Sequence, residues 1–345
     1  MRFLLLPLAA LYLSGCGNRA EVFRQESFVF GTRVEISIAG ADSDKAEAAA
    51  QSVLARFDTL HRMLHAWQPS PLSQLNRAFS TGKQQPIDAA LSAILQDARQ
   101  LSQSGDELFN PAIGQLIALW GFHADLTQTR VPDQSAIAAL IRAAPSMRNV
   151  HIENGMAWSD NPAVQIDLGG YAKGLALDEA ATILRKHDIR HALINIGGNV
   201  MALGNNVSGA RPHPWKIGIQ HPRQPGVIAT LELRDGEAIG TSGDYQRYFE
   251  VANRRYSHLI DPRTGFPAKD MQSVTVLVEG ERAGVKSDVL SKPLFIAGSG
   301  TLDKTMKQLG LTRVLAVTAD GRVLVSASMA QRIQWSTPQA FELVR

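Results

Sequence analysis

The sequence has a single cysteine, Cys16, among its 345 residues. Because a disulfide or a thiolate metal site needs at least two thiols, neither can form within the chain. A lone cysteine can be a free thiol, can form a bridge to another chain, or, in an exported protein, can be the point of lipid attachment. If a lipid occupies Cys16, the mature chain has no free thiol, and a cysteine nucleophile is excluded as well.

The apolar stretch at the N-terminus is too short to cross a membrane. It covers residues 3–13 and follows Arg2, whereas a spanning helix needs about 20 residues. Such a segment is typical of an export signal. It ends in Leu13-Ser14-Gly15-Cys16, which resembles the lipobox of bacterial lipoproteins. We therefore expect a signal peptide over 1–16, lipidation of Cys16, a linker over 17–26, and anchoring on the periplasmic side of a bacterial membrane. Gly17 stands where aspartate would signal inner-membrane retention, which favours the outer membrane.

Strong charge of one sign is also missing. The formal net charge is +3, and no dense run of lysine and arginine alternates with aromatic residues. This composition argues against a nucleic-acid partner, whereas a mildly basic surface suits an anionic small molecule. The chain contains no internal repeat and no low-complexity tract, and its content of 45% hydrophobic and 19% charged residues is ordinary for a globular protein. We expect one domain over 27–345.

The spacing of apolar residues predicts a mixed α/β (α+β) chain. Alternation over 28–38 indicates a strand, and a helical stripe is expected over 42–67. Pro86 is expected to open a second helix, which stops at Gly105. Later helices are predicted over 287–296 and 302–309, and strands over 164–166, 192–196, 215–219, 227–233, 274–278, 314–317 and 323–325.

A double glycine, Gly169-Gly170, lies between an apolar strand and a helical pattern. Backbone amides and the positive end of a helix dipole meet at such a turn, where they suit a phosphate. Lys173 is in the first turn of the helix, and Asp178 further along is placed to accept from a ribose or an adenine. The alternative is an ordinary strand-to-helix turn with a solvated lysine, since the motif matches neither common phosphate-binding signature.

The segment 241–265 concentrates hydroxyl, imidazole and carboxylate side chains. Thr241 and Ser242 lie at its start and His258 near its end. Between them, apolar and polar residues alternate as they would in a β-hairpin. We expect the hairpin to bring these groups together at a site. A surface hairpin with ordinary turn residues is the alternative.

These segments, taken in order, resemble the ApbE family, the periplasmic FAD:protein FMN transferases. The matching segments are 30–32, 72–76, 109–114, 120–122, 167–173, 195–198, 215–219, 241–245 and 258–265. The resemblance implies a single globule of mostly antiparallel or mixed sheets flanked by helices, with FAD in a central cleft. It also implies a magnesium-dependent transfer of FMN from FAD to a threonine hydroxyl of an exported acceptor protein, with release of AMP.

The resemblance further implies which residues form the site. His258 corresponds to a histidine beside the scissile phosphate, where it would act as a general base or a transition-state donor; alternatively it only orients FAD. The residues expected to bind FAD are Thr32, Asn110, Gly169, Gly170, Lys173, Asp178, Thr241, Ser242 and His258.

The expected metal site departs from the family pattern. The resemblance implies magnesium ligands at Asp288 and at a carbonyl near Gly170, but Lys292 stands where the family has a threonine ligand. Because residues four apart share a helix face, the ammonium can point to where the ion would lie and weaken or displace it. Three outcomes are open: Lys292 pairs with Asp288 and acts as a built-in cation, catalysis is lost, or the lysine reaches solvent while a water replaces the threonine oxygen.

The sequence therefore predicts an FAD:protein FMN transferase with His258, Asp288 and Lys292 as its catalytic residues. Two other functions stay open. One is a non-catalytic FAD-binding or flavin-delivery lipoprotein, and the other is a pyrophosphatase that releases FMN and AMP from FAD.

Overall fold

The computed structural model describes residues 22–124, 130–208 and 211–344. Its main element is a nine-stranded sheet in the order β1-β2-β6-β7-β10-β13-β14-β15-β17. Neighbouring strands are antiparallel except for the parallel pair β15 and β17. The strands are β1 (Phe23–Val29), β2 (Thr32–Ile38), β6 (Ala192–Ile196), β7 (Asn199–Leu203), β10 (Ala238–Gly243), β13 (Met271–Val278), β14 (Val314–Thr318), β15 (Val323–Ser326) and β17 (Glu342–Val344).

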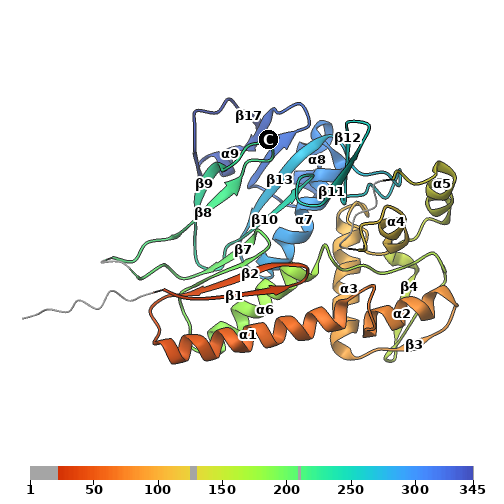
Figure 1. The fold of residues 1–345 in the computed structure, drawn as a ribbon, viewed down its shortest axis with the longest axis horizontal. Helices are drawn as coiled ribbons and strands as arrows, with labels where there is room; N and C mark the ends of the chain where they lie inside the picture. The colour runs from red at the N-terminus through yellow and green to blue at the C-terminus, as the bar shows by residue number, and fades with distance from the viewer. Residues whose placement is uncertain (1–21, 125–129, 209–210, 345) are drawn as a thin grey trace, which may run out of the picture.

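Three long helices cover one face of this sheet (Figure 1). They are α1 (Ser43–Leu64), α6 (Ala172–Lys186) and α7 (Ala283–Ala297). α1 packs on β1, α6 on β6 and β7, and α7 on β7, β10 and β13. Alternate strand residues, such as Val274 and Val276 of β13, are fully buried in the core beneath these helices. Because side chains alternate across a strand, the residues between them form a second core on the other face.

A three-stranded sheet in the order β16-β9-β8 covers that other face. Its strands are β8 (Trp215–Gln220), β9 (Val227–Leu233) and β16 (Ile333–Trp335). Leu277, Leu315 and Val317 from the large sheet pack there against Trp215 and Leu231. The centre of the molecule is thus a layer of helices, a large sheet and a small sheet.

The remaining elements lie mostly at one end of the large sheet, on the right in Figure 1. The helices among them are α2 (Pro71–Ser80), α3 (Ala89–Ser104), α4 (Gly114–Leu119) and α5 (Gln134–Ala143), and the strands are β3 (Gln85–Pro86), β4 (Val150–Glu153), β5 (Met156–Ser159) and the hairpin β11 (Tyr248–Val251) and β12 (Arg254–Ser257). Two short helices, α8 (Leu302–Gln308) and α9 (Ala327–Ala330), and two 3₁₀ turns, Met147–Asn149 and Ser299–Thr301, complete the described chain.

The predicted mixed α/β class is confirmed, with corrections to several elements. The strand predicted over 28–38 is two strands, joined by a turn at Phe30 and Gly31 in which both residues have positive φ. The helix predicted to open at Pro86 begins after Asp88, whose carboxylate accepts from the amide of Leu91, while Pro86 is in β3. Residues 164–166 form no named strand, although Gln165 makes an isolated bridge with Ile113.

The predicted export signal and Cys16 lie outside the described residues. None of the helices in the described part of the chain combines the length and apolar character needed to cross a membrane.

Candidate active site

A cavity of about 690 Å³ opens where the large sheet meets the α2 to α5 region. Its volume is within the range of roughly 300–1,000 Å³ typical of cofactor and ligand sites. The walls come from segments far apart in the sequence. They are the β1–β2 turn (30–32), residues 108–111, Ile113, Ile117 of α4, Phe122, the glycine turn with Asp167 and Lys173, Gly197, residues 246–247 and 258–260, and Lys292 and Ile296 of α7. The fold thus brings the glycine turn and His258 to one cavity.

The glycine turn is held by the carboxylate of Asp167. One oxygen accepts from the Gly169 amide at 2.8 Å, and the other accepts from the indole N–H of Trp67 at 3.0 Å. The Gly169 amide is therefore engaged within the protein, whereas the Gly170 amide has no hydrogen-bond partner among the described residues. Only Gly170 offers its amide to a ligand, which corrects the expectation that both amides do. Asp167 was not among the predicted site residues, although its place two residues before Gly169 was a signal.

Lys292 and Asp288 form a buried ion pair on α7. The Lys292 Nζ donates to Asp288 Oδ1 and to the Asp288 backbone oxygen, both at 2.7 Å. Burial by itself raises the pKa of Asp288, but Lys173, Lys292 and the Gly174 amide together hold it below its ordinary value. The second carboxylate oxygen accepts from that Gly174 amide at 3.0 Å. The carboxylate is thus ionised and engaged at both oxygens.

Close helix packing keeps Lys292 at the cavity wall. A Cβ added to Gly170 would lie 2.6 Å from Lys292 Cε, so the lysine stem passes directly over the glycine turn. Gly174 of α6 and Gly284 of α7 are in similarly close contact, because a Cβ on Gly174 would lie 2.6 Å from the Gly284 carbonyl oxygen. The absence of side chains at these positions lets α6 and α7 approach, and it aligns the turn with Lys292.

The donors around Asp288 do not fit a divalent cation. Magnesium requires a near-octahedral set of oxygen ligands, but one Asp288 oxygen is held by an ammonium and the other by an amide. A second ammonium, that of Lys173, lies 4.0 Å from Asp288 Oδ1. Across the residues that the structure describes, no cluster of three histidine, cysteine or acidic side chains can hold a metal ion. Ligation of magnesium by Gly170 and Asp288 stays a prediction from the sequence.

His258 lines the cavity as a neutral imidazole. Desolvation lowers its pKa to about 4; the hydrogen bond with the Arg247 carbonyl raises it, and the cations of Lys173, Lys292 and Arg247 lower it. This value is below the ordinary histidine pKa of 6.5. Its Nδ1 lies 3.1 Å from the Arg247 carbonyl oxygen, which can only accept. Nδ1 therefore carries the hydrogen, and Nε2 keeps a lone pair that can take a proton.

An aromatic cluster fixes the hairpin that precedes His258. Trp120 is fully buried, stacks on Tyr256 of β12 with 5.4 Å between ring centroids, and donates its indole N–H to the Gly265 carbonyl at 2.7 Å. Phe122, which lines the cavity, lies edge-on to His258 at 6.4 Å. These contacts explain why the Trp-Gly-Phe segment 120–122, which is distant from His258 in the sequence, belongs to the site.

The other predicted binding residues divide into two groups. Thr32 and Asn110 line the cavity, as Gly169, Gly170 and Lys173 do. Thr241, Ser242 and Asp178 are not part of the lining. The Thr241 hydroxyl lies 2.9 Å from that of Thr275, and the Ser242 hydroxyl lies 2.8 Å from that of Ser291. Asp178 binds the backbone at the start of α7.

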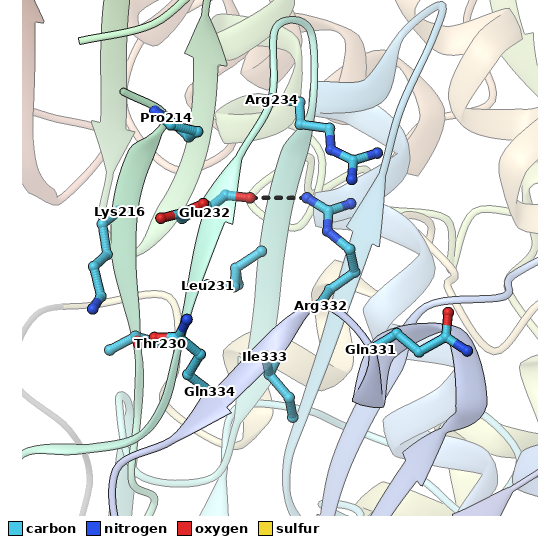
Figure 2. A pocket seen from close by; sticks show the side chains of 10 residues that line it. All are labelled: Pro214, Lys216, Thr230, Leu231, Glu232, Arg234, Gln331, Arg332, Ile333 and Gln334. Atoms are coloured by element: carbon cyan, nitrogen blue, oxygen red, sulfur yellow. Dashed lines mark hydrogen bonds between the residues drawn. The ribbon is translucent and has the colours of Figure 1, made fainter. Parts of the chain in front are cut away.

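A second cavity of about 260 Å³ lies on the small sheet, away from these residues. Figure 2 shows Lys216, Arg234 and Arg332 around it, with Arg332 directed toward Glu232. The Arg332 guanidinium is already bound to the Glu232 carbonyl and to the buried carboxylate of Glu237. Arg332 therefore helps to hold the fold, and none of the predicted site residues lines this cavity.

Comparison with known proteins places this architecture in a family. Residues 30–315 match the model of the ApbE family. An FAD:protein FMN transferase of Rhodobacter capsulatus is 39% identical over 89% of this chain, which spans 57% of the length of that relative. An FAD:protein FMN transferase of Vibrio cholerae is 31% identical, with 86% of this chain and 88% of the relative covered. The crystal structure of the ApbE protein of Thermotoga maritima superimposes with a TM-score of 0.82 at 28% identity, covering 90% of this chain and 99% of the other. The chain belongs to the ApbE family.

Proposed function

We propose that this chain binds FAD in the 690 Å³ cavity and transfers FMN from it to a threonine hydroxyl of an acceptor protein, releasing AMP. The observation that carries the proposal is the meeting, in one cavity, of a cationic wall and a neutral histidine. The names of the relatives, FAD:protein FMN transferases, support the same reaction.

The charges of the cavity suit a pyrophosphate. Lys173, Arg247 and Lys292 line it, against the single carboxylate of Asp167. Lysine binds phosphate as a point charge, and the Gly170 amide adds a neutral donor on the same side. FAD carries its negative charge on the two linked phosphates, so this wall of the cavity is where we place them.

The chemical step is a displacement at phosphorus. The threonine Oγ forms a bond to the phosphorus of the FMN half, and the bond from that phosphorus to the bridging oxygen breaks. AMP leaves with that oxygen and its electron pair, and the threonine proton goes to Nε2 of His258, which is free to accept it. The cations take up the charge that develops on the departing phosphate.

Incubation of the purified chain with FAD and an acceptor protein of the V. cholerae relative tests the proposal. We expect flavin that stays on the acceptor after denaturation, together with one AMP for each flavin attached. A parallel reaction with the exported proteins of the organism that makes this chain identifies its own acceptor by in-gel flavin fluorescence. AMP and FMN without labelled protein would indicate a pyrophosphatase, and bound FAD without either product would indicate a flavin-delivery protein.

We also propose that the chain works on the periplasmic side of a bacterial membrane, anchored through lipidated Cys16. The support is the N-terminal sequence alone. Growth with a labelled fatty acid tests the anchor, because the wild-type chain would take up label and fractionate with membranes. Cys16→Ala would do neither. Equal labelling of both chains would contradict the proposal.

A further inference from the structure

The Lys292 ammonium is only partly satisfied by the protein. Of its three N–H donors, two go to Asp288, one to the carboxylate and one to the backbone oxygen. Lys292 also lines the large cavity, with its side chain 14% exposed. The third donor is therefore available to a molecule that enters the cavity.

The charges around Asp288 leave an excess of one cation. Lys173 and Lys292 flank one carboxylate, at 4.0 Å and 2.7 Å from its Oδ1. Asp288 is 2% exposed, so water screens this cluster weakly. An uncompensated positive charge beside a buried pair is costly unless an anion neutralises it. Lys173 and Lys292 both line the cavity, so an anion that neutralises the cluster would approach from that side.

The same contacts exclude a divalent ion from this place. To bind one, Asp288 would have to give up its bonds to Lys292 and Gly174, and the ion would lie next to two ammonium groups. The ammonium of Lys292 already occupies the position beside the carboxylate, and its stem is fixed against Gly170.

The geometry points to Lys292 as the resident cation of the reaction: its ammonium holds the pyrophosphate of FAD and neutralises the departing AMP, so that this chain cleaves FAD without a divalent metal ion. This inference rests on the proposed function. The bonds made and broken are those given above. Burial lowers the pKa of Lys292 while Asp288 raises it, and the role proposed for the lysine is to contribute charge but no proton.

Titration of the purified chain with FAD, followed by quenching of flavin fluorescence, tests the binding part. We expect the dissociation constant in EDTA to agree within about twofold with that in excess magnesium, and Lys292→Met to weaken binding by at least about tenfold in both, as loss of a charged hydrogen bond does. Lys304→Met, an exposed lysine of α8, makes the same change in net charge and should bind like the wild type.

Two results with the wild type and the single variant would overturn the inference. One is a wild-type chain that loses FAD binding or FMN transfer about tenfold or more in EDTA and regains it with magnesium. The other is a folded Lys292→Met variant that binds FAD as tightly as Lys304→Met. Because the single change leaves Asp288 buried without its main partner, the double variant Asp288→Asn, Lys292→Met is measured alongside. It removes both charges, and wild-type affinity in it would equally refute the role of Lys292.

Failure of this inference is distinguishable from failure of the proposed function. If the wild type binds and transfers flavin only with magnesium, the function stands and Lys292 is not the resident cation. If the wild type binds no FAD in either condition, the proposed function fails, and this inference fails with it.

Discussion

The amide of Gly284 donates a 2.8 Å hydrogen bond to the carboxylate of Asp178, on the neighbouring helix. The adjacent Val285 amide donates to the other oxygen at 2.9 Å. Asp178 of α6 thus caps the first turn of α7, whose own preceding residue, Arg282, provides no side-chain cap. Since Lys173 is in the first turn of α6 and Lys292 is on α7, the capping contact helps to fix the two cations relative to each other.

Replacing Asp178 by alanine should lower the free energy of unfolding by about 1–3 kcal/mol, because two amides at the start of α7 lose their acceptor. Burial raises the pKa of Asp178, so part of its contribution is already offset by desolvation. Urea denaturation measures the loss, and Asp58→Ala, at an exposed position of α1, is the matched control. A loss of FAD affinity with unchanged stability would instead support the nucleotide contact predicted from the sequence.

Gly170→Ala should reduce FAD affinity by about tenfold and also lower the free energy of unfolding, because it disturbs the buried pair between Lys292 and Asp288. The new methyl group would lie 2.6 Å from Lys292 Cε and 3.2 Å from Cδ, so the lysine must leave its position beside the turn. Gly170 does not have a positive φ, and its backbone accepts alanine. Gly300→Ala is the control, because a Cβ there meets nothing within 4 Å. Fluorescence titration with FAD measures the affinity. Wild-type affinity in Gly170→Ala would show that Lys292 can leave its position without weakening FAD binding.

The sequence predicted those elements whose apolar pattern is local. Alternation at Val34, Ile36 and Ile38 identified strand residues, and the helix expected over 42–67 spans Ser43–Leu64, with Asp42 as its N-cap. Pro86 was wrongly assigned because proline is compatible with both the first turn of a helix and an edge strand. The helical spacing of apolar residues does not distinguish these two positions of Pro86. Asp88 does distinguish them, because it is a favourable N-cap three residues before Leu91.

The site required more than local pattern. The i, i+4 spacing allowed a pair between Asp288 and Lys292, which the structure contains. Whether a polar residue contacts a ligand or the protein depends on packing between distant elements, so Asp178 and Thr241 were predicted as ligand contacts although their bonds are internal. Only the family resemblance connected the glycine turn with His258, because the segments between them carry no local sign of meeting.

The low pKa of His258 predicts how the FAD-free protein responds to acid. With a folded-state pKa of about 4 against an ordinary 6.5, the unfolded chain binds a proton in this interval and the folded chain does not. Stability from this group is complete above pH 6.5 and is lost as the pH falls toward 4. The ring resonances of His258, assigned by their loss in His258→Gln, should therefore titrate near 4 in NMR spectra. A midpoint near 6.5 would mean that the imidazole is well solvated.

Glu237 offers a test of the fold away from the cavity, because it connects the two sheets. Its carboxylate, 1% exposed, accepts from Arg332 at 2.6 and 2.7 Å and from the amide of Arg234 at 2.8 Å. Burial raises its pKa, but Arg332, the Arg234 amide and Arg313 together lower it below the ordinary 4.5. Glu237→Gln should cost about 3 kcal/mol, since it leaves a buried arginine without its counter-charge.

Glu279 provides the comparison, because it binds the same Arg313 at 3.0 Å but is 59% exposed. Glu279→Gln should cost less than about 1 kcal/mol, as screened surface pairs do. The lowered pKa means that the contribution of Glu237 is complete above pH 4.5 and is lost as the pH falls further. Urea denaturation at neutral and acidic pH should therefore show a smaller acid-induced loss of stability in Glu237→Gln than in Glu279→Gln. If the two variants lose stability equally with acid, Glu237 is not ionised in the native state, and its arginine contacts cannot be what fastens the small sheet to the large one.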